Sequence, residues 1–589
     1  MIATRYDIAL MKNRYHLLLM LLWLAIGTGL RFVRLESLPP WTDECATIVF
    51  SLGNSFRPVP LNQLISSDVL LQPLQPIPTV GISAVIEHLL DESTHPPVYF
   101  VLAHFWMKLF SPPGELVSIW AARSLSAFFG VASIPAMFGF GYLTFRSKLV
   151  GQMAAAMMAT SPYAVFLARE ARHYTLVILL IIASLCCFIK AIQTIHRQQS
   201  LPIWVVLTWV AMNSLGVATH YFFTLTLCAE GFVLLWQIWV KANQTTFAYV
   251  RTNWWRIWIV IMGTLVGCLV WIPALKSIPG NDLTTWVASS NPHVRWLEPI
   301  GRLLLWTMSM LLLLPSAITN LPLAIVIVSG IVTLLFLLWS LPNLIYGLKI
   351  QKQSDSDLAI QILSGYLVGA IALCLAFTYG LGMDLTLAAR FQFVCVSAII
   401  LLLGAALAGC WNQVKNFNQH RQKLRLLVNG KVAVSIIWLM AVLGGVTVVW
   451  NLGYLQNQRP DLLASLIQRV SPQKVLIATT HLHHGQTGRM MGLAWEYQNW
   501  PAQNLQFFLA RQDSKTKDYT QAMQVFSEQL TKIPRPLDLW LVEFRTQVDL
   551  ESQQCFPDAR YGKSTGEYSY KLYHCTTQKN DTSQTNISS

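Results

Sequence analysis

The first three quarters of the chain alternate between long apolar runs and short polar gaps. A helix needs about 20 apolar residues to cross the hydrocarbon core of a bilayer. Runs of about that length cover residues 15–33, 117–144, 149–167, 174–194, 202–219, 221–240, 257–275, 322–346, 359–380, 389–411 and 432–452. The pattern predicts a polytopic α-helical membrane protein.

Two further runs leave the number of crossings between 11 and 13. Residues 96–110 are short, and residues 301–320 are interrupted by Pro315. Cytoplasmic loops are enriched in Lys and Arg. The gaps of this kind hold Arg146 and Lys148; Lys190 and Arg197; Lys241, Arg251 and Arg256; Lys349 and Lys352; and Lys415, Arg421, Lys423 and Arg425. All of them fall inside the cell only if neither doubtful run crosses, which favours 11 crossings and two interfacial helices. Either count is odd, so an inside N-terminus places the C-terminus outside.

Two polar regions interrupt this pattern. Residues 34–95 are too long for a tight turn, and the chain after residue 453 becomes charged, with strand-like runs at Val475–Thr479 and Leu539–Glu543. We expect a membrane module of residues 1–453, with an extracytoplasmic first loop at 34–95, and an extracytoplasmic soluble α/β domain at 454–589.

The tail also carries two cysteines. If it lies outside the cell, Cys555 and Cys575 can form a disulfide, with Cα atoms within about 7 Å. Tyr568, Tyr570 and Tyr573 alternate between them as expected for a strand. His481, His483 and His484 have no carboxylate nearby in the sequence, which favours a solvated loop over a metal site.

The composition agrees with a membrane protein and excludes other classes. Hydrophobic residues make up 54% of the chain and charged residues 12%, whereas about 25% of the residues of a soluble domain are charged. The formal net charge of +14 lies mostly in the gaps and the C-terminal region. We therefore expect membrane lipids, and no nucleic acid, as partners of the basic residues.

Asp43 and Glu44 directly follow Trp41, just after the first span. Adjacent carboxylates raise each other's pKa, and together they can take a proton from a hydroxyl and hold a cation. The alternative is a structural role, because acidic residues also stabilise the first turn of a helix such as 42–52.

Other polar residues gather where apolar runs end. His95 precedes Pro96-Pro97, and the turn Arg169-Glu170-Ala171-Arg172-His173-Tyr174 joins two spans. Two arginines beside a histidine fit recognition of a phosphate, or an interfacial belt with an internal Arg–Glu pair. His220-Tyr221 lies in another such turn. Arg390 can bind a phosphate or pair with Asp384.

The order of these motifs resembles a known superfamily. The set consists of Trp41–Glu44, His95–Tyr99, Ala122–Gly130, Glu170–Leu176, Thr219–Phe222 and Ala389–Phe391. It is similar to bacterial membrane glycosyltransferases of the GT-C superfamily, in the branch of the protein O-mannosyltransferases and aminoarabinose transferases. The resemblance covers about residues 15–410.

The resemblance implies transfer of a sugar, in the hexosyltransferase class, from a polyprenyl-phosphate donor to an acceptor hydroxyl outside the cytoplasm, in the inner (plasma) membrane. Asp43 matches the general base of an inverting reaction, and Glu44 orients the acceptor or helps Asp43 to hold Mg²⁺, Mn²⁺ or Zn²⁺. The residues implied to bind the donor are His95, Arg169, Arg172, His173, Tyr174, His220, Tyr221 and Arg390. Phe391 stands where the family usually has Tyr, and no acidic residue closely follows His173-Tyr174, so a second acidic metal ligand is missing there.

The sequence leaves two other readings open. A transporter or flippase of lipid-linked sugars would have the same apolar bulk, but the charged residues lie at span ends and no inverted repeat is visible. A membrane scaffold with a binding tail would not account for the ordered motifs. The sequence identifies neither the sugar nor the acceptor, which is a glycan, a lipid or a protein.

Overall fold

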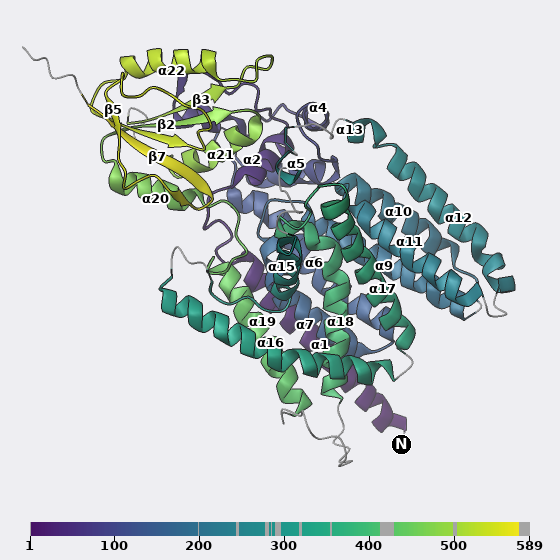
Figure 1. The fold of residues 1–589 in the computed structure, drawn as a ribbon. Coiled ribbons are helices and arrows are strands. Elements are labelled where there is room, and N and C mark those ends of the chain that lie inside the picture. The colour runs from purple at the N-terminus through teal and green to yellow at the C-terminus, as the bar shows by residue number, and fades with distance from the viewer. Residues whose placement is uncertain are drawn as a thin grey trace, which may run out of the picture. The chain divides into compact units, whose positions relative to one another are not determined.

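The computed structural model describes most of the chain (Figure 1). The described residues are 2–112, 114–197, 199–242, 247–276, 282–283, 285–288, 296–316, 321–353, 356–412, 429–498 and 504–576. The basic gap at 415–425 and most of the polar loop 276–298 lie outside them. The protein is a polytopic helical membrane protein with a smaller α/β part.

The described fold divides into two compact units, which we describe one at a time. The first contains residues 1–35, 89–103 and 122–455, and the second contains residues 36–88, 104–121 and 456–589. The soluble domain expected at 454–589 therefore folds in one unit with most of the first loop. The division passes through helices α4 (Ile82–Glu92), α5 (Val98–Phe110) and α6 (Ile119–Phe145).

Helices make up the first unit. Besides α6 and parts of α4 and α5, they are α1 (Ile2–Phe32), α7 (Lys148–Thr160), α8 (Pro162–Ala168), α9 (Tyr174–His196), α10 (Ile203–Thr219), α11 (Phe223–Ala242), α12 (Phe247–Leu269), α13 (Ile272–Lys276), α14 (Thr285–Ala288), α15 (Glu298–Ser309), α16 (Leu323–Lys352), α17 (Asp357–Leu375), α18 (Phe393–Trp411) and α19 (Gly430–Val449). Short turns η3 (Ala376–Gly380) and η4 (Ala389–Gln392) continue α17 and precede α18.

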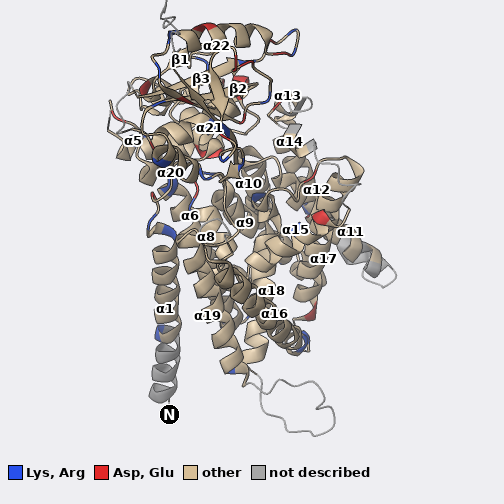
Figure 2. Cartoon of the chain, turned by 60° about the vertical axis from the view of Figure 1, so that its left-hand side comes forward, with Lys and Arg blue, Asp and Glu red and all other residues tan. Residues whose placement is uncertain are grey.

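Within the described residues, 7 helices are long and apolar enough to cross a membrane. They are α6, α9, α16, α19, residues 14–32 of α1, α17 with η3, and η4 with α18. Shorter apolar helices lie at Val98–Phe110, Ile203–Thr219, Phe223–Gln237 and Trp255–Leu269. Figure 2, which colours the ribbon by residue type, shows few positions of Lys, Arg, Asp or Glu along these helices.

The core of the first unit forms where small residues let helices approach closely. A Cβ added to Gly404 of α18 would lie 2.7 Å from the backbone nitrogen of Ala154 in α7. A side chain at Gly404 would therefore collide with the backbone of α7, and such close contacts at small residues are usual where helices pack inside a membrane. The helix α18 is accordingly the most enclosed of the candidate spans.

Two predicted runs differ from the observed helices. The run 149–167 is two helices, because Ser161 ends α7 and caps α8, whose first residue is Pro162. The run 301–320 begins earlier, at Glu298, and its helix ends at Ser309; residues 312–316 are not helical. Pro315 therefore lies after the helix instead of inside it.

A mixed sheet organises the second unit. Its strands are β1 (Leu64–Ile65), β2 (Lys474–His481), β3 (Leu505–Arg511), β4 (Leu537–Val542), β5 (Cys555–Pro557), β6 (Ser564–Thr565) and β7 (Tyr568–Cys575), in the order β1-β3-β2-β4-β7-β5 with β6 beside β7. The strands β3, β2 and β4 are parallel, and β7 is antiparallel to β4. The two strand-like runs seen in the sequence are thus confirmed as β2 and β4.

Helices from both ends of the sequence complete this unit. The tail supplies α20 (Pro460–Val470), α21 (His484–Trp495) and α22 (Thr520–Lys532), and the first loop supplies α2 (Thr42–Ser51), α3 (Ser67–Leu71) and the turn η1 (Gln72–Leu74). The first loop also forms the edge strand β1, with Leu64 opposite Phe508.

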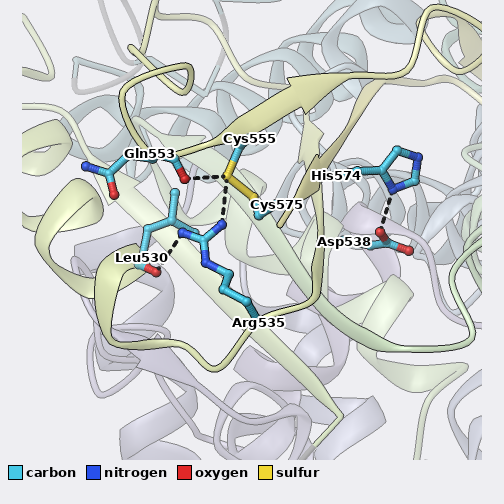
Figure 3. The surroundings of a disulfide bond; sticks show 7 residues. All are labelled: Leu530, Arg535, Asp538, Gln553, Cys555, His574 and Cys575. Carbon is cyan, nitrogen blue, oxygen red and sulfur yellow. Dashed lines mark hydrogen bonds and ion pairs between the residues drawn. A yellow bond between two sulfur atoms is a disulfide. The ribbon is translucent and has the colours of Figure 1, made fainter. Parts of the chain in front are cut away.

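A disulfide closes the other edge of the sheet. Cys555 and Cys575 are bonded and lie opposite each other on β5 and β7, with Cα atoms 3.9 Å apart (Figure 3). The predicted pairing is confirmed. Beside it, Arg535 points its guanidinium at the Cys555 sulfur, 3.2 Å away.

Candidate functional site

The turn between α8 and α9 carries most of the predicted donor-binding residues, and a hydrogen-bond network fixes it. The Ser126 hydroxyl of α6 donates to the Arg172 carbonyl at 2.5 Å, and the Thr175 hydroxyl donates to the Ser126 carbonyl at 2.9 Å. The single hydroxyl proton of Ser126 is used in the bond to Arg172. In the contact between Tyr99 of α5 and Ser126 Oγ, 2.8 Å long, the Tyr99 hydroxyl is therefore the donor. Three helices thus hold the backbone of Arg172 in place.

Arg169 has a different environment from the rest of this turn. Its Nη1 donates to the carbonyl of Val33 at 2.7 Å and to those of Leu30 and Arg31 at 3.2 Å, and its Nη2 donates to the carbonyl of Arg34 at 2.9 Å. These carbonyls form the C-terminal end of α1, where a cation is favourable. The predicted substrate-binding residue therefore closes a helix end in this structure.

His95 contacts Arg172 directly. Its Nε2 lies 3.1 Å from Arg172 Nη2, and its Nδ1 lies 3.2 Å from Ser93 Oγ. A guanidinium can only donate, so Nε2 accepts, and His95 is neutral with its proton on Nδ1. The pair leaves the positive charge on Arg172.

His220 and His173 stand next to this pair. The ring centroids of His173 and His220 are 4.6 Å apart, and that of His95 lies 5.4 Å from His173 and 6.5 Å from His220. His220 Nδ1 accepts from the backbone N–H of Phe222 at 3.0 Å, so a neutral His220 carries its proton on Nε2. His220 can therefore donate to a ligand oxygen.

His173 is buried, and among the described residues neither of its ring nitrogens has a hydrogen-bond partner. A buried polar group without a partner costs free energy unless a ligand or water pairs with it. His173 directly precedes α9, and the rings of His220 and Tyr174, at 4.6 and 4.7 Å, lie against it. The position fits a residue that receives its partner from a bound molecule.

Burial decides the charge of these histidines. It lowers the pKa of His173 and of His220 well below the ordinary range, and the nearby cations Arg172 and Arg390 lower both further. Both side chains lie in turns outside the helices. At neutral pH they are therefore uncharged hydrogen-bonding groups, and the arginines supply the positive charge that a phosphate needs.

Arg390 lies on the turn η4, directly before α18, and its charge acts on His173 and His220. Its guanidinium lies 5.6 Å from the ring centroids of Trp286 and Phe391. The alternative partner named from the sequence, Asp384, is engaged elsewhere: its carboxylate accepts from Arg302 at 2.5 Å and from the Thr386 hydroxyl at 2.6 Å. Arg302 thus neutralises Asp384, a pairing that the sequence did not indicate.

The two predicted tyrosines differ. Tyr174 is buried, and Arg172 lies 5.7 Å above its ring, so it belongs to the cluster. Tyr221 packs against Trp271 at 6.2 Å. We therefore define the cation–histidine cluster as His95, Arg172, His173, Tyr174, His220 and Arg390.

Asp43 and Glu44 lie in the other unit, on the first turn of α2, and they are placed differently from each other. The Glu44 side chain is buried, and its Oε2 accepts from the Trp41 backbone N–H at 3.4 Å. This is the capping role that the sequence left open. Asp43 is half-buried and so remains reachable from solvent. Of the two carboxylates, Asp43 is the better placed to meet a substrate.

No group of three or more His, Cys, Asp or Glu side chains within the described ranges could hold a metal ion. The three tail histidines, interpreted from the sequence as a solvated loop, form the junction between β2 and α21. His481 Nε2 lies 2.8 Å from Thr487 Oγ1, and His483 Nδ1 accepts from the Gly485 backbone N–H at 3.1 Å. His484 is the first residue of the helix.

Comparison with protein families places one segment of the chain. Residues 111–278 match the family model described as dolichyl-phosphate-mannose-protein mannosyltransferase. The match confirms the resemblance found in the sequence motifs over this segment. The mannosyltransferase-family segment contains Arg169, Arg172, His173, Tyr174, His220 and Tyr221, whereas Asp43, Glu44, His95 and Arg390 lie outside it.

Several solved structures match this chain at low sequence identity. ArnT from Cupriavidus metallidurans in the apo state matches with 10% identity and a TM-score of 0.46, over 95% of this chain and 98% of that one. AglB from Archaeoglobus fulgidus, in complex with an inhibitory peptide and a dolichol-phosphate, matches with 10% identity and a TM-score of 0.45, over 95% and 74%. The arabinofuranosyltransferase AftD from Mycobacteria matches with 14% identity and a TM-score of 0.41, over 97% and 40%. No curated protein matches.

Proposed function

We propose that this protein is an inverting membrane glycosyltransferase that moves a sugar from a polyprenyl-phosphate donor to an acceptor hydroxyl on the extracytoplasmic face. The observation that carries the proposal is the cation–histidine cluster around His173, whose ring nitrogens have no partner among the residues that the structure describes. Most of the cluster lies in the mannosyltransferase-family segment. A lipid phosphate requires fixed cations and N–H donors at the membrane surface, and the cluster supplies both.

In this proposal Arg172 and Arg390 bind the donor phosphate, and His220 donates from Nε2 to one of its oxygens. Asp43 takes the proton from the acceptor hydroxyl, whose oxygen attacks the anomeric carbon while the bond from that carbon to the phosphate oxygen breaks. The products are the inverted glycoside and the free polyprenyl phosphate. The arginines stabilise the leaving phosphate as its charge develops, so no general acid is needed there.

The proposal includes a divalent cation, Mg²⁺, Mn²⁺ or Zn²⁺, only as an ion that Asp43 and Glu44 would bind. Such an ion would polarise the acceptor hydroxyl. Glu44 is buried and caps Trp41, so Asp43 would be its accessible ligand. The acceptor is a glycan, a lipid or a protein. The disulfide between Cys555 and Cys575 supports an oxidising, extracytoplasmic side for the tail, with the protein in the inner membrane.

The test is turnover of purified protein in lipid nanodiscs with a labelled polyprenyl-phosphate mannose donor, measured by release of polyprenyl phosphate. We expect Asp43→Asn to lower turnover by about 10²-fold or more because it removes the base. Asp68→Asn is the matched control, since Asp68 is an exposed acid in the first turn of α3 in the same loop. It should keep wild-type turnover.

Arg172→Ala separates donor binding from chemistry in the same assay. We expect a raised donor KM with a smaller change in kcat, because the guanidinium acts on the phosphate in the ground state as well. Wild-type turnover in Asp43→Asn would leave Asp43 as a helix-end residue and contradict the proposed base. Transport of the labelled donor without release of polyprenyl phosphate would instead support a flippase.

A further inference from the structure

The short helix α2 is held at both ends by other parts of the second unit. At its start, the backbone N–H and the hydroxyl of Thr42 both donate to the side-chain oxygen of Gln458, the N–H at 3.4 Å. At its end, His104 Nδ1 donates to the Ser51 carbonyl at 2.8 Å, and this imidazole is buried. Asp43 is the next residue after Thr42. Its backbone is therefore fixed from the tail side of the unit.

The side of α2 lies against α21 across two glycines. A Cβ added to Gly488 would lie 3.2 Å from the Thr42 carbonyl oxygen, and one added to Gly492 would lie 2.7 Å from the Pro40 carbonyl oxygen. Gly488 and Gly492 are four residues apart on one face of α21, as at other close helix contacts. The chain leading into Asp43 thus rests directly on the backbone of a tail helix.

The helix α21 is itself anchored to the sheet, so it is a rigid support. The Arg489 guanidinium lies 4.7 Å from the ring centroid of Tyr568 on β7 and 3.6 Å from the Glu543 carboxylate at the end of β4. The Tyr568 hydroxyl donates back to the Arg489 carbonyl at 3.2 Å. Gly488 and Arg489 are neighbours, so the contacts to α2 and to the sheet come from the same turn.

His484, at the start of α21, completes the contact. Its ring stacks on Phe56 at 4.9 Å with an interplanar angle of 16°, and meets Phe50 of α2 edge-on at 5.6 Å. Burial and the two neighbouring histidines lower the pKa of His484 to about 3, and the Asp43 carboxylate opposes this shift. His484 is thus an uncharged aromatic group that packs on the C-terminal half of α2.

We propose that α21 is the positioning element for Asp43, and that Gly488, Gly492, His484 and Gln458 act as positioning residues for the reaction. The proposal rests on the proposed function, in which Asp43 is the base. It assigns a role to the tail: the sheet fixes α21, and α21 fixes the start of α2. A misplacement of about 1 Å costs about 10²-fold in rate when a base must meet a hydroxyl.

A graded glycine series in the full-length protein tests this proposal. Gly492→Ala forces the Pro40 carbonyl to move, Gly488→Ala requires a smaller shift, and Gly562→Ala is the control because a Cβ there meets nothing within 4 Å. Alanine is a better helix former than glycine, so the two helix variants do not weaken α21 itself. We expect wild-type kcat in Gly562→Ala, a lower kcat in Gly488→Ala, and a kcat about 10²-fold below wild type in Gly492→Ala. The donor KM should be unchanged in all three variants.

A second pair of variants, at His484, adds no steric bulk where α2 packs against α21. His484→Phe keeps the ring stack on Phe56 and should retain turnover, whereas His484→Ala removes the stack and should lower kcat with an unchanged donor KM. Wild-type kcat in both Gly492→Ala and His484→Ala, with Asp43→Asn inactive, would overturn the positioning role and leave the proposed base intact. An active Asp43→Asn variant would instead remove the basis of both. A raised donor KM in Gly492→Ala would also contradict a role confined to the base.

Discussion

At the scale of single residues, the most informative side chain is His173, because it is buried and its hydrogen-bonding capacity is unused among the described residues. Two other histidines are paired within the protein: His104 donates to a carbonyl, and His95 accepts from Arg172. An unpaired buried group costs about 1–3 kcal/mol. Such a cost is understandable where a ligand supplies the partner.

We predict opposite effects of His173→Phe on stability and on binding. Phenylalanine fills the site without an unpaired nitrogen, so the melting temperature should stay equal or rise, while the donor KM rises because a phosphate contact is lost. His95→Phe is the matched control, since it breaks the contact to Arg172 and should lower the melting temperature. A lowered melting temperature with an unchanged donor KM for His173→Phe would show that the ring serves the fold alone.

The residue types of the site could be predicted from the sequence, but their roles only in part. Trp41–Glu44 predicted both a base and a cap, and in the structure Glu44 is the cap while Asp43 is only half-buried. Arg169 and Arg172 look alike in sequence, yet only the fold reveals that Arg169 meets the end of α1. Hydrogen bonds between distant segments decide such roles, and no local pattern records them.

At the scale of elements, apolar runs predicted helices well where one run forms one helix, as for residues 174–194 and α9. The run 149–167 misled because apolar character continues across the helix break at Ser161-Pro162. The edge strand β1 could not be predicted, because its two residues carry no pattern and their partners on β3 lie far along the chain. The same holds for the contact of α2 with α21.

A charged bridge between β4 and β7 makes the sheet sensitive to pH. His574 Nδ1 lies 2.7 Å from Asp538 and its Nε2 lies 3.2 Å from Asp558. Burial lowers the pKa of His574, but the hydrogen bonds and charges of both carboxylates outweigh it, and the pKa is raised. The bridge is therefore complete below about pH 6.5, the ordinary pKa of His, and is lost as the pH rises through the raised value.

We predict that wild type loses stability relative to His574→Gln between pH 6 and pH 8.5. The measurement is the difference in melting temperature between the two proteins at each pH. Because the His574 side chain is 43% exposed, the difference at pH 6 should shrink at high salt. A difference that stays constant across this range would show that folding does not raise the pKa of His574.

At the scale of the whole molecule, the membrane topology decides on which side of the membrane the chemistry takes place. The length of each helix limits whether it can cross. The doubtful helices α5 and α15 have 13 and 12 residues, which at 1.5 Å per residue gives about 20 Å and about 18 Å, against about 30 Å for the hydrocarbon core. Both are too short to cross alone. The helix α7 has the same 13 residues as α5, so length alone does not separate 11 from 13 crossings, and 11 stays a prediction that rests on placing every basic gap inside the cell.

The final prediction is that the turn at Arg146–Lys148 faces the cytoplasm while the tail faces outside. A reporter active only outside the cytoplasm should be active when fused after residue 460, and inactive when inserted at this turn. With 13 crossings the tail result is the same, but the turn reporter becomes active, because α5 then crosses and inverts the middle of the chain. In the full-length protein isolated from cells, Cys555 and Cys575 should resist alkylation until they are reduced, since their disulfide requires the oxidising side. An active cytoplasm-only reporter at residue 460, together with freely alkylated Cys555 and Cys575, would reverse the orientation and move the proposed reaction to the other face of the membrane.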